Sequence, residues 1–309
     1  MTDLPPNGKP VRDGSPDLIR AEGGTPRHTR LAAEQRLAAL LAKLREEADP
    51  SARPTTSGMR YVGVDLAWGP NATTGLAVLD DQGRLLDVTD ARTDEQIEAW
   101  LHDWAPADCL VAFDAPLIVR NASGRRSCET LVSRHFGRFH AACHSSSLSR
   151  PEFADGGRAL RLASRSGLDP DPASEADRRA VEVYPHPALV SLFELPRILR
   201  YKNKKGRDLD FRRRELTRLL DHLENLETAR PAMSVRQHEG WLRIRTSIRH
   251  ATRKVDLDRV EDSIDAVVCA YIALHFDAAP DRRRILGTYD DGYIVTPVTP
   301  DIAAAIDAG

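Results

Sequence analysis

The sequence predicts an α/β fold, in which a mixed β-sheet made of an antiparallel hairpin and parallel strands is flanked by helices. Three stretches carry this prediction. Two strand-like apolar runs flank a turn in residues 59–80, as in a β-hairpin. Residues 109–113 are apolar throughout, which is typical of a strand buried on both faces. Residues 256–276 carry apolar side chains at helical spacing and predict a core helix.

Length and composition limit the classes to which the protein can belong. The 309 residues are enough for one large domain or two small ones. Nothing approaches the roughly eighteen consecutive apolar residues of a membrane span, and the first residues lack the apolar core of a signal peptide. We therefore expect a cytoplasmic protein without membrane association. The net charge of −2 means that any surface that binds nucleic acid must be local.

The first 58 residues are expected to be an extension of the folded domain. Residues 1–27 show no apolar periodicity and predict a disordered tail. Residues 28–47 predict an amphipathic helix that could dock on the domain, pair with a partner helix or stay unpaired. A linker then leads to Met59, the expected start of a domain that covers residues 59–300.

The remaining elements follow in chain order. We expect a third strand over residues 84–90, and then a helix that Thr93 caps. A strand over 180–184 ends at Pro185, which starts a short helix through residue 193. Two insertions are expected: loops and short helices over 118–178, and a basic helical segment over 197–254. A hairpin over 285–295 and a short C-terminal helix end the chain, with residues 301–309 as its tail.

Two predicted strands that we expect to run parallel each end in an aspartate. Asp65 ends the first strand, and Asp114 follows the apolar run 109–113. Burying an aspartate as an ion is costly unless a partner such as a metal neutralises it. The alternative for Asp65 is a side chain that caps the turn. Because ligands of open α/β sheets bind outside the carboxyl ends of the strands, the repeated pattern favours a site at this edge.

The late helix adds a pair of acids, and two further residues are candidates. Asp262 and Asp265 are three residues apart, so they lie on one face of the helix beside its buried stripe. They repel each other unless a cation or a basic group lies between them. Glu182 lies within the strand over 180–184, where the alternative is an outward-facing residue, and His186 lies just past it.

A basic run covers residues 197–218. Ten basic and three acidic residues give it a net charge of +7, and it contains Tyr201, Phe211 and a Gly206 loop. Such a mixture suits contacts with a phosphate backbone. The alternative is a solvated charged face. The candidate nucleic-acid contacts are Arg200, Lys202, Lys204, Lys205 and Arg207.

Several motifs together resemble one family. They are VGVDLAW, FDAPL, EVYPHPALVSLF, the pair Tyr201-Lys202, and DSIDAVVCAY. In this order they resemble the domain-of-unknown-function family 429, whose members are regarded as predicted nucleases with a ribonuclease H-like fold. The resemblance covers about residues 59–300 and excludes the N-terminal extension.

The resemblance implies a metal-dependent nuclease that hydrolyses phosphodiester bonds of nucleic acid. Asp65, Asp114 and one or both of Asp262 and Asp265 would hold two Mg²⁺ or Mn²⁺ ions roughly 4 Å apart. One ion would lower the pKa of a water molecule, and the other would stabilise the leaving oxygen. The resemblance also suggests roles for three more residues. Glu182 would be a further ligand or would support the ligands from outside the metal site, and Lys202 and His186 would contact the scissile phosphate or assist proton transfer.

Two alternatives stay open. The turn over residues 65–75 is compatible with a nucleotide-dependent phosphotransferase or ATPase, although such enzymes usually duplicate the fold and no second copy is present. The other alternative is a non-catalytic scaffold or nucleic-acid-binding protein, which would gain no stability from metal.

Overall fold

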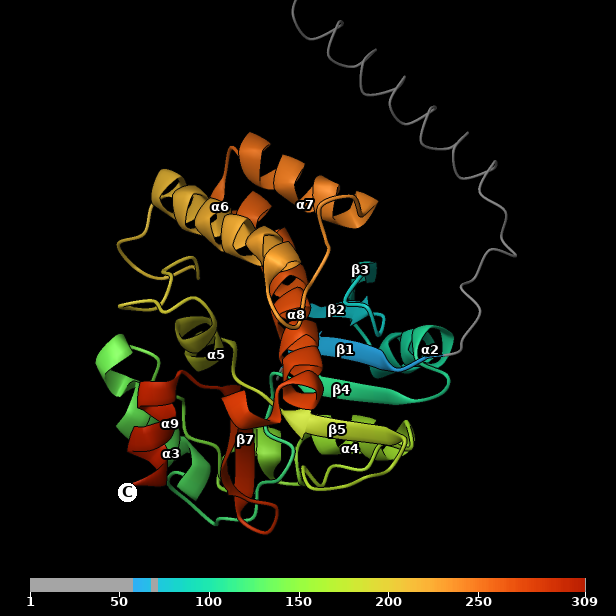
Figure 1. The fold of residues 1–309 in the computed structure, drawn as a ribbon, viewed down its shortest axis with the longest axis vertical. Coiled ribbons are helices and arrows are strands. Elements are labelled where there is room, and N and C mark those ends of the chain that lie inside the picture. The colour runs from blue at the N-terminus through green and yellow to red at the C-terminus, as the bar shows by residue number, and fades with distance from the viewer. Residues whose placement is uncertain (1–57, 68–71, 309) are drawn as a thin grey trace, which may run out of the picture. The chain divides into compact units, whose positions relative to one another are not determined.

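The computed structural model describes residues 58–67 and 72–308, so the predicted tail, the helix over 28–47 and most of the linker lie outside the described residues. Five strands form a mixed sheet in the order β3-β2-β1-β4-β5, as Figure 1 shows. The strands are β1 (Arg60–Asp65), β2 (Thr74–Leu79), β3 (Leu85–Ala91), β4 (Cys109–Phe113) and β5 (Arg178–Glu182). β2 is antiparallel to β1 and β3, whereas β1, β4 and β5 are parallel.

The predicted strands are confirmed with small shifts. β1 and β2 are the expected hairpin, and β4 is the expected apolar strand, buried along its whole length. β5 lies two residues earlier than expected, at 178–182 instead of 180–184. Its first two residues are arginines, which fit there because Arg178 donates to the carbonyl oxygen of Ala105 and Arg179 pairs with Asp277.

The predicted core helix is α8 (Lys254–Ala278), which packs across β1, β2 and β4 on one face of the sheet. Glycines let it approach closely, because a Cβ at Gly63 would overlap the carbonyl oxygen of Ala266. Helices α2 (Asp94–Trp104) and α4 (Arg158–Arg165) lie behind the sheet in Figure 1. The sheet is therefore a middle layer, and side chains on the α8 face are shielded from water.

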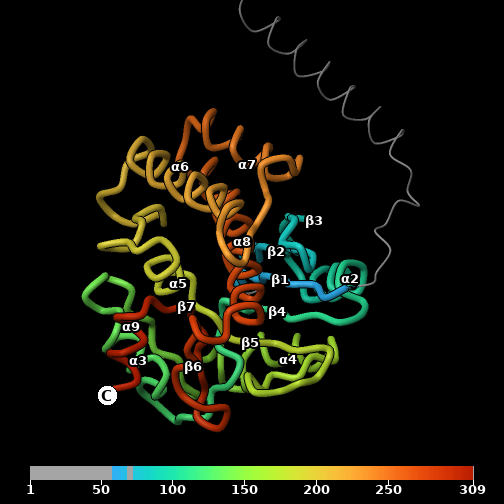
Figure 2. The backbone as a smooth tube through the Cα atoms, in the orientation of Figure 1, coloured from blue at the N-terminus to red at the C-terminus, as the bar shows by residue number. Residues whose placement is uncertain are grey.

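The other elements surround this core. They are α3 (Ser127–Phe136), α5 (Pro185–Leu192), α6 (Leu209–Asn225), α7 (Glu239–His250), the hairpin β6 (Arg283–Thr288) and β7 (Gly292–Pro297), and α9 (Pro300–Asp307). Figure 2 shows α6 and α7 beside the first half of α8, and α3 beside α9. The predicted hairpin and C-terminal helix are confirmed, and Ile302 of α9 is buried. Among the described residues, no helix combines the length and apolar character needed to cross a bilayer.

Candidate active site

The register of the parallel strands brings two predicted aspartates together. Val64 of β1 pairs with Phe113 of β4, and the backbone N–H of Asp114 donates to the carbonyl oxygen of Val64 at 2.9 Å. Asp65 and Asp114, one residue further along each strand, therefore lie side by side at the carboxyl edge. Because side chains alternate along a strand, both are on the same face as Gly63, which packs against α8.

Helix α8 places its acids over that edge. A Cβ at Gly75 of β2 would overlap the carbonyl oxygen of Asp262, so helix and strand meet there backbone to backbone. Asp265 lies almost one turn further along and is fully buried. The negative charges of Asp114, Asp262 and Asp265 all act on Asp65. We call these four aspartates the acidic cluster.

A lysine ammonium group lies within the acidic cluster. The Nζ atom of Lys202 pairs with Oδ2 of Asp265, lies 3.3 Å from Oε1 of Glu261 and lies 3.9 Å from Oδ2 of Asp65. The preceding residue holds the other oxygen of the same carboxylate, because the hydroxyl of Tyr201 donates to Oδ1 of Asp265 at 2.7 Å. Two consecutive residues thus fix the most buried acid of the cluster.

Burial and mutual repulsion raise the pKa values of three aspartates, Asp65, Asp114 and Asp262. Burial raises the pKa of Asp65 well above its usual range, and the neighbouring acids add to this, although Lys202 opposes it. The same causes raise the pKa of Asp114 to about 7 and that of Asp262 to about 6. Burial alone would lower the pKa of Lys202, but Asp265 and Asp65 raise it well above its usual range, so the lysine stays charged. The one ammonium group therefore does not offset the burial and mutual repulsion of these carboxyl groups, which hold their protons to a higher pH than usual.

His186 lies beside the cluster as a neutral imidazole. Its ring packs edge-on against Tyr184 and Tyr201, with ring centroids 5.5 and 5.8 Å away. Burial lowers the pKa of His186 to about 4, and its Nδ1 atom is buried without a hydrogen-bond partner in the described part of the chain. It is placed to act as a neutral donor or acceptor rather than as a cation at neutral pH.

Glu182 is held by a different set of partners. It pairs in register with Phe113, one residue before Asp114, and so its side chain points to the other face of the sheet. Its carboxylate accepts hydrogen bonds from both Nη atoms of Arg126, at 2.6 and 2.8 Å, and from the backbone N–H of Leu117 at 2.9 Å. The structure therefore brings together the other predicted acids and holds Glu182 in an ion pair with Arg126, from which its charge still acts on Asp114.

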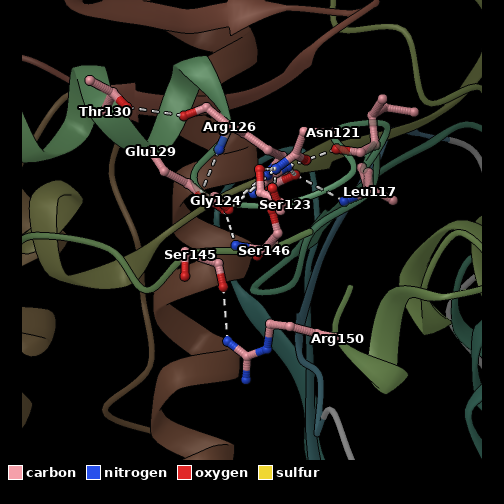
Figure 3. Close-up of polar contacts among 12 residues, drawn as sticks. Leu117, Asn121, Ser123, Gly124, Arg126, Glu129, Thr130, Ser145, Ser146 and Arg150 are labelled. Carbon is pink, nitrogen blue, oxygen red and sulfur yellow. Dashed lines mark hydrogen bonds and ion pairs between the residues drawn. The ribbon is translucent and has the colours of Figure 1, made fainter. Parts of the chain in front are cut away.

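That ion pair belongs to a buried network, part of which Figure 3 shows. Arg126 also pairs with Glu129 at 2.9 Å, and Glu129 accepts from the backbone N–H of Ser146 at 2.9 Å. The network joins the segment after Asp114 to β5, to α3 and to the loop around Ser146. Its evident role is to fix the backbone that follows Asp114.

The basic run is divided between the surface and the interior. Arg200, Lys204 and Lys205 are exposed, whereas the guanidinium of Arg207 turns back onto the carbonyl oxygens of Lys202 and Arg200. Arg212 is fully buried and pairs with Glu261 at 2.7 Å and with Asp258 at 2.8 Å. The surface next to the site is therefore less positive than the sequence suggests, because Arg212 serves as an internal counter-ion.

Sequence reasoning missed two residues of the site. Glu261 contacts Lys202 through one oxygen and Arg212 through the other. It is four residues before Asp265, and this helical spacing was a signal that could have included it. In the sequence Tyr201 is an aromatic residue of the basic run, and nothing there marks its hydroxyl as a partner of Asp265.

The donors in the cluster fit a hard divalent cation by their chemistry. Carboxylate oxygens are the ligands that Mg²⁺ and Mn²⁺ prefer, and the Oδ2 atom of Asp65 is buried without a hydrogen-bond partner. Within residues 58–67 and 72–308, however, no three His, Cys, Asp or Glu side chains are already arranged to hold a metal ion. The Lys202 ammonium group lies instead among two carboxylates of the cluster, those of Asp65 and Asp265, and the carboxylate of Glu261.

Comparison with known proteins assigns the chain to a family. A family model described as "Protein of unknown function (DUF429)" matches residues 63–290. The chain belongs to this family. The DUF429 match spans all four aspartates of the acidic cluster as well as Lys202, and it confirms the resemblance noted in the sequence. No curated protein and no solved structure gives a significant match. The family description names no activity, so any function has to be argued from the site.

Proposed function

We propose that this DUF429 protein has a ribonuclease H-like fold and acts as a metal-dependent nuclease. One observation carries the proposal: four aspartates from two strand ends and one helix converge at the carboxyl edge of the sheet. The strand order β3-β2-β1-β4-β5, with only β2 antiparallel to its neighbours, supports the fold assignment. A structural role alone does not explain why so many like charges are gathered in a buried place.

The chemistry of the site follows from its donors. Mg²⁺ or Mn²⁺ held by Asp65, Asp114, Asp262 and Asp265 would supply an activated water and stabilise negative charge on the phosphate in the transition state. Tyr201 orients Asp265 through its hydrogen bond, so that this ligand does not turn away from the site. His186, which is neutral and within range of the charge of Asp265, would exchange a proton with the substrate or a water molecule.

The surroundings favour a polyanionic substrate. Lys204 and Arg207 lie close enough to His186 that their charges help to lower its pKa, so positive charge stands at the rim of the acidic cluster. Exposed Arg200 and Lys205 extend it. Such residues hold a phosphate backbone without reading its sequence, which supports DNA or RNA as a sequence-nonspecific substrate.

The test compares the wild-type protein with Asp65→Asn and Asp114→Asn. Each is incubated with Mg²⁺ or Mn²⁺ and with labelled single-stranded, duplex and junction substrates, and Mn²⁺ binding is measured by calorimetry. The expected result is cleavage by the wild-type protein that both variants lose, with an exposed control, Asp291→Asn, still active. Metal binding without cleavage of any nucleic acid would contradict the nuclease function. It would favour the phosphotransferase alternative, whose turn lies partly outside the described residues, at 68–71.

A further inference from the structure

Lys202 has the charge and the position of a bound cation. Its ammonium group contacts carboxylates from β1 and from two positions of α8, those of Asp65, Glu261 and Asp265. Asp265 is fully buried, whereas 27% of the Lys202 side chain is exposed. The lysine thus reaches into the cluster from the surface and neutralises acids that come from separate elements.

We propose that Lys202 is the internal counter-ion of the metal-free protein, and that a divalent cation displaces its ammonium group from the acidic cluster. The inference rests on the proposed function, because it takes the cluster to be the metal site. It adds that the ammonium and the metal compete for the same carboxylates. The site then exists in two states, one closed by lysine and one loaded with metal.

The charges of the site support an exchange of this kind. If Lys202 simply left, the buried acids would stand unpaired, which is strongly unfavourable. If a divalent ion entered while the ammonium stayed, two like charges would share one small space. Each cation therefore excludes the other, and the cluster always keeps one of them. Arg212 does not take part in the exchange, since it is fully buried between Glu261 and Asp258.

The loop that carries Lys202 allows its side chain to leave. Residues 203–206 are exposed, and Gly206 takes a left-handed conformation with φ of 81°. Tyr201 is fully buried and Arg207 bonds back to the loop, so the backbone is anchored on both sides of this turn. A lysine has a flexible four-carbon stem and no fixed fork geometry. A change of its side-chain rotamers is therefore enough to move the ammonium outward.

The displaced ammonium group would be available to bind a phosphate. It would stand at the rim of the site, on the same loop as Lys204 and next to Arg207. There it can contact a phosphate that approaches the loaded cluster. Metal binding would thus create a phosphate-binding cation, and the protein would bind metal before it binds substrate productively.

The experiment measures Mn²⁺ affinity and thermal unfolding for the wild-type protein, Lys202→Met and Lys254→Met. The control removes an exposed lysine at the start of α8. The expected result is that Lys202→Met binds Mn²⁺ about tenfold or more tightly than wild type, since close charge pairs typically contribute at least that factor. In EDTA this variant should unfold at a lower temperature than wild type, and Mn²⁺ should raise its unfolding temperature more. The control should match the wild type in each measurement.

If Lys202→Met does not fold, an NMR measurement on the wild-type protein tests the proposal instead. With isotope-labelled lysine, addition of Mg²⁺ should move the NMR signal of the Lys202 side chain toward the position of an exposed lysine. A signal that stays unchanged at saturating Mg²⁺ would overturn the proposal. Equal Mn²⁺ affinity in Lys202→Met and wild type would do the same, even in a protein that cleaves nucleic acid. If Lys202→Met binds Mn²⁺ more tightly than wild type but neither protein cleaves nucleic acid, the counter-ion role is supported. Only the nuclease function is then contradicted.

Discussion

The backbone of Gly75 in β2 lies against the carbonyl oxygen of Asp262 in α8, with no side chain between them. Gly63 in β1 makes a similar approach to Ala266. These two contacts set how far α8 lies above the sheet, and therefore how far its acids lie from Asp65. The acidic cluster depends on two residues that have no side chains.

Replacing Gly75 with alanine should push α8 away from the sheet. Because the added Cβ would overlap the Asp262 backbone, we expect the free energy of unfolding to fall by about 2 kcal/mol. Mn²⁺ affinity should fall as well, since Asp262 moves. Urea denaturation and calorimetry check both effects. The matched control is Gly137→Ala, where φ is −59° and, among the described residues, nothing beyond its own chain neighbours lies within 4 Å of the new Cβ, so its stability should stay the same or rise.

Replacing Glu182 with glutamine should affect stability rather than metal binding. The change leaves Arg126 with a weakened partner in a buried place, and we expect unfolding to become easier by about 3 kcal/mol. The number of Mn²⁺ ions bound should stay the same, because Glu182 lies outside the acidic cluster. Loss of a bound ion in this variant would show instead that Glu182 is a ligand, as the family resemblance suggests.

Removing the Tyr201 hydroxyl should loosen Asp265. In Tyr201→Phe, a buried hydrogen bond to a carboxylate is lost, which should lower the free energy of unfolding by about 2 kcal/mol. Mn²⁺ affinity should fall several-fold, because Asp265 is no longer oriented. Calorimetry of the variant beside Tyr289→Phe, a half-buried tyrosine near the β6–β7 turn, separates this effect from a general loss of a hydroxyl.

His275 should make folding sensitive to acid. Burial, and then the charges of Arg282 and Arg283, lower its pKa from 6.5 to about 4, and its side chain is almost fully buried. As the pH falls below 6.5, the unfolded chain binds a proton at this residue before the folded protein does. The free energy of unfolding therefore falls by up to about 3 kcal/mol between pH 6.5 and 4.

The variant His275→Leu isolates this contribution. The difference in unfolding free energy between wild type and variant should change across that pH interval and stay constant above pH 7. A constant difference at all pH values would mean that His275 takes up its proton equally in both states.

The fold was predictable from the sequence because local residues alone indicate the type of each main element. Residues 109–113 have no polar member, and α8 has a long apolar stripe, so tertiary context did not have to decide their type. The start of β5 was harder to predict. Arg178 and Arg179 look unlike strand residues, and only their distant partners, the Ala105 carbonyl and Asp277, explain why they fit.

Site residues were predictable where their spacing or their position at a strand end indicated that they lie together. The strand-end positions of Asp65 and Asp114 and the three-residue spacing of Asp262 and Asp265 both signalled the convergence that the structure has. Lys202 was expected in the site only from the family resemblance, and its ion pairs with the acids were not predictable, because these partners are about 60 or more residues away and no periodicity links them. The same holds for Glu182, whose partner Arg126 comes from an irregular region.

The position of α8 on the sheet also matters while the chain is being made. Strands β1, β2 and β4 are complete by Phe113, but α8 begins only at Lys254. At synthesis rates of about 5–20 residues per second, the sheet face that α8 covers stays uncovered for seconds while the rest of the chain is made. During that interval the face that α8 later covers is open to contact with other chains. A chain that stops before Asp262 would therefore lack the helix that covers this face and should aggregate.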